Sequence, residues 1–259
     1  MTRQLAEMTA AEVGAAVAAG AATVILPLGA TEQHGAHLPL GTDSFRAAAL
    51  ADRLADALGD ALVAPVLPIG CSDEHTGFAG LIGLDHATLA RIAEDIARRV
   101  AAWGVRRLVL LSAHGGNAAA LERARTRLDA DGVPLTVVIC CAAASLGQAL
   151  QAVAAADGIS PEARGLHAGE GETSEMLHLR PDLVRIEHAR AGYVGPSPGL
   201  LDELRQKGVR AVAPGGVLGD PRCASARRGA RYLEAQLGVW REHLGAASAG
   251  GGGSVEHRR

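Results

Sequence analysis

Aromatic side chains are scarce in this sequence. Two Trp, two Tyr and two Phe make up 2% of the 259 residues, whereas Ala and Gly are abundant. A core of normal density must therefore be assembled from Ala, Val, Leu and Ile, with helices packed closely over small side chains. The chain is long enough to bury such a core within one domain.

An excess of basic residues is also missing. The net charge is −3 with His counted as neutral, and Lys and Arg are scattered apart from short pairs such as Arg106-Arg107 and Arg227-Arg228. Nucleic-acid binding requires a concentrated positive field, so we expect no nucleic-acid partner. We interpret the two pairs as solvated surface of helices.

Long apolar runs and paired cysteines are missing as well. Two uncharged stretches, 13–30 and 132–156, are interrupted by Gly and Pro, which is typical of a strand joined to a helix rather than of a membrane span. No C-x-x-C spacing occurs among the four cysteines, which are Cys71, Cys140, Cys141 and Cys223. We therefore expect a soluble, cytoplasmic protein with buried, reduced thiols and no membrane partner.

Strand-like and helical patterns alternate along the chain. Four apolar runs are typical of buried strands, at residues 23–28, 62–69, 107–112 and 135–141. Four amphipathic stripes with helical spacing lie at residues 50–58, 89–100, 117–128 and 233–244. Asp85 is a candidate N-cap for the helix of the second stripe. The alternation predicts an α/β fold with a layered, mostly parallel β-sheet flanked by helices.

Composition also predicts the domain boundaries. No internal repeat or linker interrupts residues 1–245, so we expect this part to form a single domain. The Gly- and Pro-rich segment 192–219 is expected to form long irregular loops. Residues 246–259 include four consecutive glycines, which predicts a flexible tail.

A loop rich in potential metal ligands follows the first predicted strand. It carries Glu32, His34 and Asp43 between Gly and Pro residues. Carboxylate oxygens combined with an imidazole nitrogen suit Zn, Mn or Fe in the 2+ state. Because α/β enzymes keep their active sites at the carboxyl ends of the strands, this loop predicts a metal site that other segments must complete.

The third predicted strand ends in His114, followed by Gly115, Gly116 and Asn117. The two glycines would let backbone N–H groups approach a ligand, and Asn117 is a candidate cap for the next helix. An ordinary turn would explain the segment equally well. A further polar loop after the second strand contains Glu74 and His75, and it is either substrate-facing or a plain loop. We take these residues as candidates for substrate binding.

His167, Glu170, Glu172 and Glu175 precede an apolar helical run. Carboxylates in the first turn of a helix are stabilised by the helix dipole, so solvated glutamates at a capped helix start would explain Glu170 and Glu175. That interpretation explains His167 and Glu172 less well. The sequence also contains no phosphate-binding loop and no dinucleotide fingerprint after a strand.

Taken together, these segments resemble the creatininase (creatinine amidohydrolase) family. The similarity extends from about Leu26 to Gly229 and includes a late loop at Gly216–Pro221. The segments that carry it are Thr31–Gly35, Pro39-Leu40, Thr42-Asp43, His114–Asn117, His167–Gly169 and Glu172–Ser174. The resemblance implies a creatininase-like α/β fold, a two-metal amidohydrolase site and a homo-oligomer, commonly a hexamer.

The resemblance also implies roles for individual residues. Glu32, His34, Asp43 and His114 correspond to ligands of two divalent ions, with Asp43 bridging them. Glu172 corresponds to the fifth ligand or to a close neighbour of the site. His167, with Glu172 beside it, corresponds to the residue that moves protons during C–N cleavage. Two ions that share a water would lower its pKa and polarise the amide carbonyl. The metal identity stays open among Zn, Mn and Fe.

Departures from the family pattern bear on the substrate. Creatininases carry a Glu where this chain has Gly116, and candidate aromatic residues to enclose creatinine are few. The segment Leu204–Pro221 is more similar to the branch of the family that trims the mycofactocin precursor peptide by removing a C-terminal dipeptide. We therefore expect a peptidase. The alternatives are a hydrolase of creatinine or another small cyclic amide, and a non-catalytic metal-binding scaffold.

Overall fold

A parallel four-stranded sheet organises the fold. The structure is a computed structural model that describes residues 2–196 and 199–250. The strands lie in the order β2-β1-β3-β4 and are all parallel. Their bounds are Thr23–Leu28 (β1), Ala61–Val63 (β2), Arg107–Ser112 (β3) and Thr136–Cys140 (β4). The predicted α/β class and the mostly parallel sheet are confirmed.

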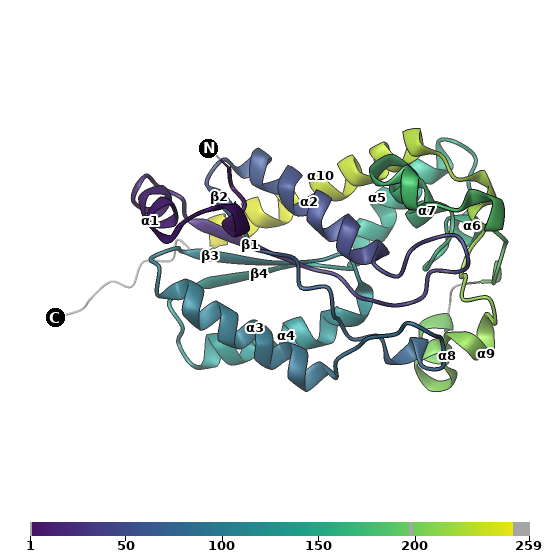
Figure 1. Ribbon diagram of the computed structural model, residues 1–259, viewed down its shortest axis with the longest axis horizontal. Coiled ribbons are helices and arrows are strands. Elements are labelled where there is room, and N and C mark those ends of the chain that lie inside the picture. Colours follow the sequence, from purple (N-terminus) through teal and green to yellow (C-terminus); the bar gives the residue numbers. More distant parts are fainter. Residues whose placement is uncertain (1, 197–198, 251–259) are drawn as a thin grey trace.

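Two layers of helices cover the sheet (Figure 1). One face carries α3 and α4, and the opposite face carries α2, α5 and α10, with α7 beside them. The bounds of these helices are Thr42–Leu58 (α2), His86–Ala101 (α3), Ala118–Ala130 (α4), Ala144–Ala155 (α5), Glu170–Leu179 (α7) and Ala226–Gly250 (α10). The four predicted helical stripes all fall in helices. Asp85 caps α3 as predicted, accepting a hydrogen bond from the Thr88 N–H at 2.9 Å.

Successive residues of the central strands supply the two halves of the core. Val24 and Leu26 point towards α3 and α4, whereas Ile25 packs against α2 and α10. This alternation follows from the pleat of a strand, and burial on both faces explains why β1 is apolar throughout. The core is mainly aliphatic, as the composition predicts. Leu28 of β1 pairs with Ser112 of β3, so the segments that follow these two strands start side by side.

The second strand is shorter than predicted. We expected residues 62–69, whereas β2 covers Ala61–Val63. Pro65 interrupts the run because it has no N–H group to donate to a neighbouring strand. Backbone pairing resumes at Leu67, whose N–H donates to the Pro27 carbonyl at 3.0 Å. The chain thus returns to the end of β1 and leads the next loop towards the same edge of the sheet.

The segment 192–219 is more regular than predicted. It contains two short helices, α8 (Leu200–Lys207) and α9 (Val209–Val212). Leu200, Leu204 and Val209 bury their side chains in a small cluster with Leu218, and this packing explains why the helices form. The other short helices are α1 (Ala10–Ala18), α6 (Pro161–Arg164) and the 3₁₀ turns η1 (Leu5–Glu7), η2 (Asp73–His75), η3 (Gly115–Asn117), η4 (Pro181–Leu183), η5 (Ile186–His188) and η6 (Pro221–Cys223).

The last helix extends beyond the predicted domain boundary. Because α10 reaches Gly250, the first residues of the predicted tail 246–259 are helical. Residues 251–259 lie outside the described residues. The assignment of residues 1–245 to one domain stays a prediction.

The cysteines differ in exposure. Cys71, Cys140 and Cys141 are buried free thiols, as predicted, but Cys223 is exposed because it ends η6 at the surface. Among the helices of the described residues, none combines the length and the apolar character needed to cross a membrane.

Candidate metal centre

The predicted metal ligands come together at the carboxyl ends of β1 and β3. Glu32 and His34 lie on the loop after β1, and His114 is the second residue after the end of β3. Glu172 belongs to the first turn of α7. Asp43, which the sequence suggested as a loop residue, is instead the second residue of α2. The ligands therefore come from four separate segments of the chain.

Asp43 lies between two groups of donor atoms. Its Oδ2 is 3.4 Å from His114 Nδ1, and His114 Nε2 is 3.5 Å from Glu32 Oε2. Its Oδ1 is 3.6 Å from His34 Nε2, which is 3.7 Å from Glu172 Oε2. Within each group the donor atoms lie no more than 4.8 Å apart. One carboxylate thus faces both groups, each with a different oxygen.

The donor cluster is buried and poor in hydrogen bonds. Glu32 and His34 are 0% exposed and Asp43 is 2% exposed. Among the described residues, seven buried side-chain atoms have no hydrogen-bond partner, and four of them are Glu32 Oε1, Glu32 Oε2, His34 Nε2 and Asp43 Oδ2. Unpartnered buried carboxylate oxygens are costly unless a cation neutralises them. The donor set of carboxylates and imidazoles therefore fits divalent Zn, Mn or Fe.

The protonation of the cluster reflects its crowding. Burial, with the Asp43 charge in support, raises the pKa of Glu32 to about 7. Burial lowers the pKa of His34 and His114, but the surrounding carboxylates outweigh it and raise the two values to about 9 and about 10. Burial raises the pKa of Asp43, but the neighbouring imidazoles of His34 and His114 outweigh it and hold this pKa well below the usual range. Because these donors bind a metal ion in their deprotonated form, metal binding here would displace protons from His34 and His114.

His167 is held in one orientation. Its Nε2 donates to the Gln33 carbonyl at 2.6 Å, and its Nδ1 lies 3.5 Å from Glu32 Oε1. Burial and the neighbouring His34 lower the pKa of His167 to about 3. The charge of Glu172, which we expected beside His167, also acts on this imidazole, although the carboxylate oxygen within 4 Å of Nδ1 is that of Glu32. The neutral Nδ1 of His167 therefore presents a lone pair to the donor cluster.

Glu172 is fixed by its own loop. Ala168 adopts φ +49°, a left-handed conformation that is uncommon for residues other than Gly. In this conformation the Ala168 N–H donates to Glu172 Oε2 at 2.7 Å. Burial raises the pKa of Glu172, but Arg46 and His34 outweigh it, and the carboxylate stays ionised.

The surroundings of Gly116 explain why this chain has no Glu at that position. A Cβ atom on Gly116 would overlap the carbonyl oxygen of Cys71 and Nε2 of His114. No side chain fits there while His114 keeps its position. Glu172 of α7 supplies a carboxylate to the cluster from another direction. Gly115 is more open, since a Cβ on it would meet only the Ala142 side chain at 3.8 Å.

The other candidate substrate-binding residues lie in different environments. His75 is buried with Nε2 3.2 Å from Glu32 Oε1, and burial lowers its pKa to about 2. Glu74 is half-buried, and within the described part of the chain its side chain forms no hydrogen bond or ion pair. Asn117 accepts from the Cys71 N–H at 2.9 Å and donates to the Gly29 carbonyl at 3.0 Å. Its side chain does not cap α4, so that prediction is wrong. Substrate contact by these residues stays a prediction.

Two helix-start glutamates are buried rather than solvated. Glu170 is 0% exposed and accepts from Tyr232 Oη at 2.7 Å and from the guanidinium of Arg228. Arg228 is therefore a buried partner, not the solvated surface residue that we expected. Glu175 accepts from Arg46 at 2.7 Å. Because Arg228 of α10 pairs with Glu170 and Arg46 of α2 pairs with Glu175, α7 can bury both carboxylates.

Sequence reasoning missed two residues that organise the cluster. Arg46 donates to Asp43 and Glu172, and its position three residues after Asp43 on one helix face was the available signal. Gln33 places its Nε2 2.9 Å from His75 Nδ1 and 3.1 Å from the Gly216 carbonyl. It lies directly before His34, but nothing in the sequence distinguished it.

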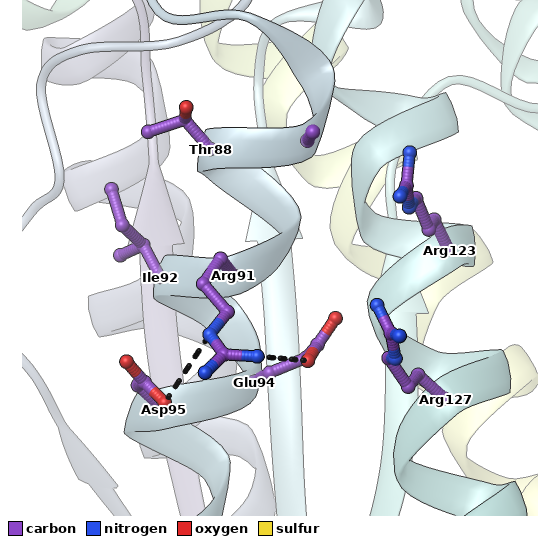
Figure 2. A pocket seen from close by; sticks show the side chains of 8 residues that line it. Thr88, Arg91, Ile92, Glu94, Asp95, Arg123 and Arg127 are labelled. Carbon is purple, nitrogen blue, oxygen red and sulfur yellow. Dashed lines mark ion pairs between the residues drawn. The ribbon is translucent and has the colours of Figure 1, made fainter.

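A surface cavity elsewhere has different chemistry (Figure 2). It lies along α3 and α4, where Arg91 pairs with Glu94 and Asp95, and Arg123 and Arg127 come from the neighbouring helix. None of the predicted metal ligands lines this cavity. The site chemistry is therefore concentrated at the sheet edge.

Comparisons with known proteins agree with this geometry. The family model described as "Creatininase: Creatinine amidohydrolase" matches residues 6–244. A mycofactocin precursor peptide peptidase from Mycobacterium tuberculosis (strain ATCC 25618 / H37Rv) is 39% identical over 224 residues, which cover 83% of this chain and 81% of the relative. The corresponding peptidase from Mycolicibacterium smegmatis is 37% identical, covering 81% and 79%. Creatinine amidohydrolase from Pseudomonas putida is 34% identical, covering 88% and 90%.

Solved structures show the same relationship. A crystal structure of creatinine amidohydrolase (creatininase) is 31% identical, with a TM-score of 0.74 and coverage of 96% of each chain. A structure described as creatininase Mn is 30% identical, with a TM-score of 0.74 and coverage of 96% of this chain and 97% of the other. The chain belongs to the creatininase family and is a hydrolase of C–N amide bonds.

Proposed function

We propose that this protein is a metal-dependent peptidase that trims a mycofactocin-type precursor peptide. The observation that carries the metal dependence is the set of four unpartnered buried atoms on Glu32, His34 and Asp43. The peptide substrate is supported by the relatives at 37–39% identity, which are named mycofactocin precursor peptide peptidases.

We assign two divalent ions to the cluster. Glu32, Asp43 and His114 would hold one ion, and His34, Asp43 and Glu172 would hold the other, with Asp43 as the bridge. When bound, such ions polarise an amide carbonyl and lower the pKa of water. The donor chemistry leaves Zn, Mn and Fe open. A solved relative described as creatininase Mn supports manganese as one of the candidates.

His167 is our candidate for proton transfer. Its Nε2–H is committed to the Gln33 carbonyl, so Nδ1 is the nitrogen that can take up a proton. Burial and the neighbouring His34 keep this imidazole neutral near pH 7. We propose that Nδ1 accepts a proton during attack on the amide and delivers it to the departing nitrogen. Glu172 contributes as a metal ligand and as a neighbouring charge.

A peptide fits the surroundings of the cluster better than a flat heterocycle. The Glu172 side chain is 17% exposed, and Leu166, which precedes His167 in the sequence, is 42% exposed, so solvent reaches the cluster at Glu172. Among the described residues, the ring-to-ring contacts at the cluster join imidazoles to one another. No Trp, Tyr or Phe ring of the described residues contacts these imidazoles, which favours a peptide over creatinine. Creatinine or another small cyclic amide is the second candidate, supported by the Pseudomonas putida relative.

Metal analysis combined with two substrates tests the proposal. We expect purified protein to contain close to two equivalents of Zn, Mn or Fe and to release a C-terminal fragment from a mycofactocin precursor peptide. Creatinine serves as the competing substrate. Protein that holds only trace metal, and gains no hydrolysis when Zn or Mn is added, would refute metal dependence. Bound metal without turnover of any amide would indicate a non-catalytic scaffold.

We also propose that the protein acts in the cytoplasm as a homo-oligomer, with a hexamer as the expected form. Exposed apolar side chains such as Ile82 (56%) and Leu201 (55%) are compatible with contacts between copies. Light scattering coupled to size-exclusion chromatography measures the state directly. A monomeric mass at micromolar concentration would refute the oligomer.

A further inference from the structure

The guanidinium of Arg46 lies at the junction of three segments that carry metal ligands. Its Nη1 donates to Asp43 Oδ1 at 3.2 Å in α2 and to Glu172 Oε1 at 2.7 Å in α7. The same nitrogen lies 3.2 Å from the Ala113 carbonyl, directly before His114. The side chain of Arg46 is 8% exposed. One buried cation thus contacts two candidate ligands and the backbone next to a third.

Arg46 binds one oxygen of each carboxylate, and on Asp43 this oxygen, Oδ1, is also the one that faces His34 at 3.6 Å. Asp43 Oδ2 has no hydrogen-bond partner and faces His114. Glu172 Oε2 faces His34 at 3.7 Å. A guanidinium is planar and its donors are fixed relative to one another, so it orients the carboxylates that it binds. Arg46 therefore fixes the orientation of the Asp43 and Glu172 carboxylates beside His34.

Arg46 is itself held by a chain of buried hydrogen bonds. Its Nε donates to Glu175 Oε2 at 2.7 Å, and Glu175 Oε1 accepts from Gln236 Nε2 at 2.9 Å. Glu175 and Gln236 are each 2% exposed. The chain runs from α10 through α7 to α2 and ends at the candidate ligands. It connects the long C-terminal helix to the cluster without offering a group to the substrate.

We propose that the Gln236–Glu175–Arg46 chain is a positioning device that sets the affinity of the site for the divalent ion held by His34, Asp43 and Glu172. The inference rests on the proposed metal centre. Hydrogen-bond partners of metal ligands commonly contribute a factor of about 10–100 to metal affinity. The alternative is a buried ion pair that serves the fold alone.

A second buried group of hydrogen bonds, also between α7 and α10, provides a matched control. Glu170 of α7 is bonded to Arg228 and Tyr232 of α10 and to Ser174, and it touches no candidate ligand. Glu170→Gln should therefore loosen the packing of α7 against α10 without altering the cluster. Glu175→Gln makes the same chemical change within the chain that we propose.

The experiment compares the wild-type protein with Arg46→Lys, Glu175→Gln and Glu170→Gln. Each protein is stripped with a chelator, checked for folding by circular dichroism and titrated with Zn²⁺ or Mn²⁺ against a chromophoric chelator. We expect all three variants to lose stability. Arg46→Lys and Glu175→Gln should in addition lose about 10–100-fold in affinity for one of two ions. Glu170→Gln should keep both wild-type affinities.

The outcomes separate this inference from the proposed function. Wild-type protein that binds no divalent ion refutes the metal centre itself and the inference with it. Wild-type protein that binds two ions, together with wild-type affinities in folded Glu175→Gln and Arg46→Lys, refutes the positioning role alone. An equal loss of affinity in Glu170→Gln also refutes it, because general loosening of α7 would then explain the effect. Should Arg46→Lys fail to fold, Glu175→Gln still decides.

Discussion

Asp43 and His114 meet at the sheet edge with Oδ2 3.4 Å from Nδ1, although one begins a helix and the other follows a strand. The register of β1 against β3 explains this contact. Leu28 pairs with Ser112, so the two strands end side by side and the segments that follow them start close together. Helix α2, which begins after the loop that follows β1, then places Asp43 next to His114, two residues beyond β3. A parallel sheet thus joins two distant parts of the sequence into one potential ligand pair.

Asp43→Asn tests whether this carboxylate bridges two ions. The amide keeps the shape of the side chain but loses the charge and one acceptor oxygen. We expect the variant to hold at most one equivalent of metal and to lose more than about 100-fold in activity. This loss would exceed the factor of about 10–100 that is typical when a hydrogen-bond partner of a metal ligand is removed. Elemental analysis and peptide cleavage assays measure the two effects. A folded variant with two tightly bound ions would show that Asp43 is not a bridge.

Gly116→Ala should destabilise the fold through a single methyl group. The added Cβ would overlap the Cys71 carbonyl oxygen and His114 Nε2. Overpacking of this kind costs about 1–3 kcal/mol, and here it also displaces a candidate ligand. Gly147→Ala in α5 is the matched control, because a Cβ at that position has no neighbour within 4 Å. We expect Gly147→Ala to be neutral or stabilising by up to about 1 kcal/mol.

Thermal unfolding and metal titration measure both glycine variants. Gly116→Ala should unfold at a lower temperature, by roughly 2–4 °C for each kcal/mol lost in a chain of this size. Its affinity for the ion held by His114 should fall as well. Equal melting temperatures of Gly116→Ala and the wild-type protein would mean that the His114 loop can move aside.

The α/β class could be predicted because local patterns and tertiary structure agree. Val24, Ile25 and Leu26 are apolar in succession, and a parallel sheet covered on both faces buries all of them. The length of β2 was overestimated because Pro65 removes a donor without changing the apolar character of the run. The helix beginning at Leu200 was missed because Gly and Pro around it obscured a short apolar stripe that only packing against Leu218 stabilises.

The candidate ligands could be predicted because His and carboxylate residues follow strands whose ends meet. In the structure Glu32 lies in one group of potential ligands with His34 and in another with His114. Arg46 was not predictable as a buried residue, because an Arg three positions after an Asp on an amphipathic helix is usually an exposed ion-pair partner. Its burial depends on Glu175, which comes from a distant helix. Such pairings depend on how α2 and α7 pack, which no local pattern encodes.

The metal-free protein should lose stability as the pH rises above neutrality. Burial opposes protonation of His34 and His114, but nearby carboxylates raise their pKa values to about 9 and about 10, above the ordinary value of 6.5. The folded state then binds more protons than the unfolded state, so this stabilisation is complete below about pH 6.5 and is lost as the pH rises through 9 to 10. Urea denaturation of chelator-treated protein at several pH values measures the trend. Stability that is constant or increases over this range would contradict it.

Asn117→Ala separates a structural role from the predicted contact with substrate. The Asn117 side chain joins three loops at the sheet edge through the Cys71 N–H, the Gly29 carbonyl and Ser112 Oγ, at 2.9, 3.0 and 3.1 Å. Removing it takes this partner from the Cys71 N–H and the Gly29 carbonyl, at a cost of about 1–3 kcal/mol for each group that stays unsatisfied. Ser112 Oγ keeps its hydrogen bonds to the His114 backbone. Because Asn117 is 0% exposed, we expect a large decrease in the free energy of unfolding while KM for a cleaved peptide stays unchanged in the folded fraction. Denaturant titration and steady-state kinetics on the same preparation measure both quantities, and an increase in KM with wild-type stability would instead place Asn117 in contact with the substrate.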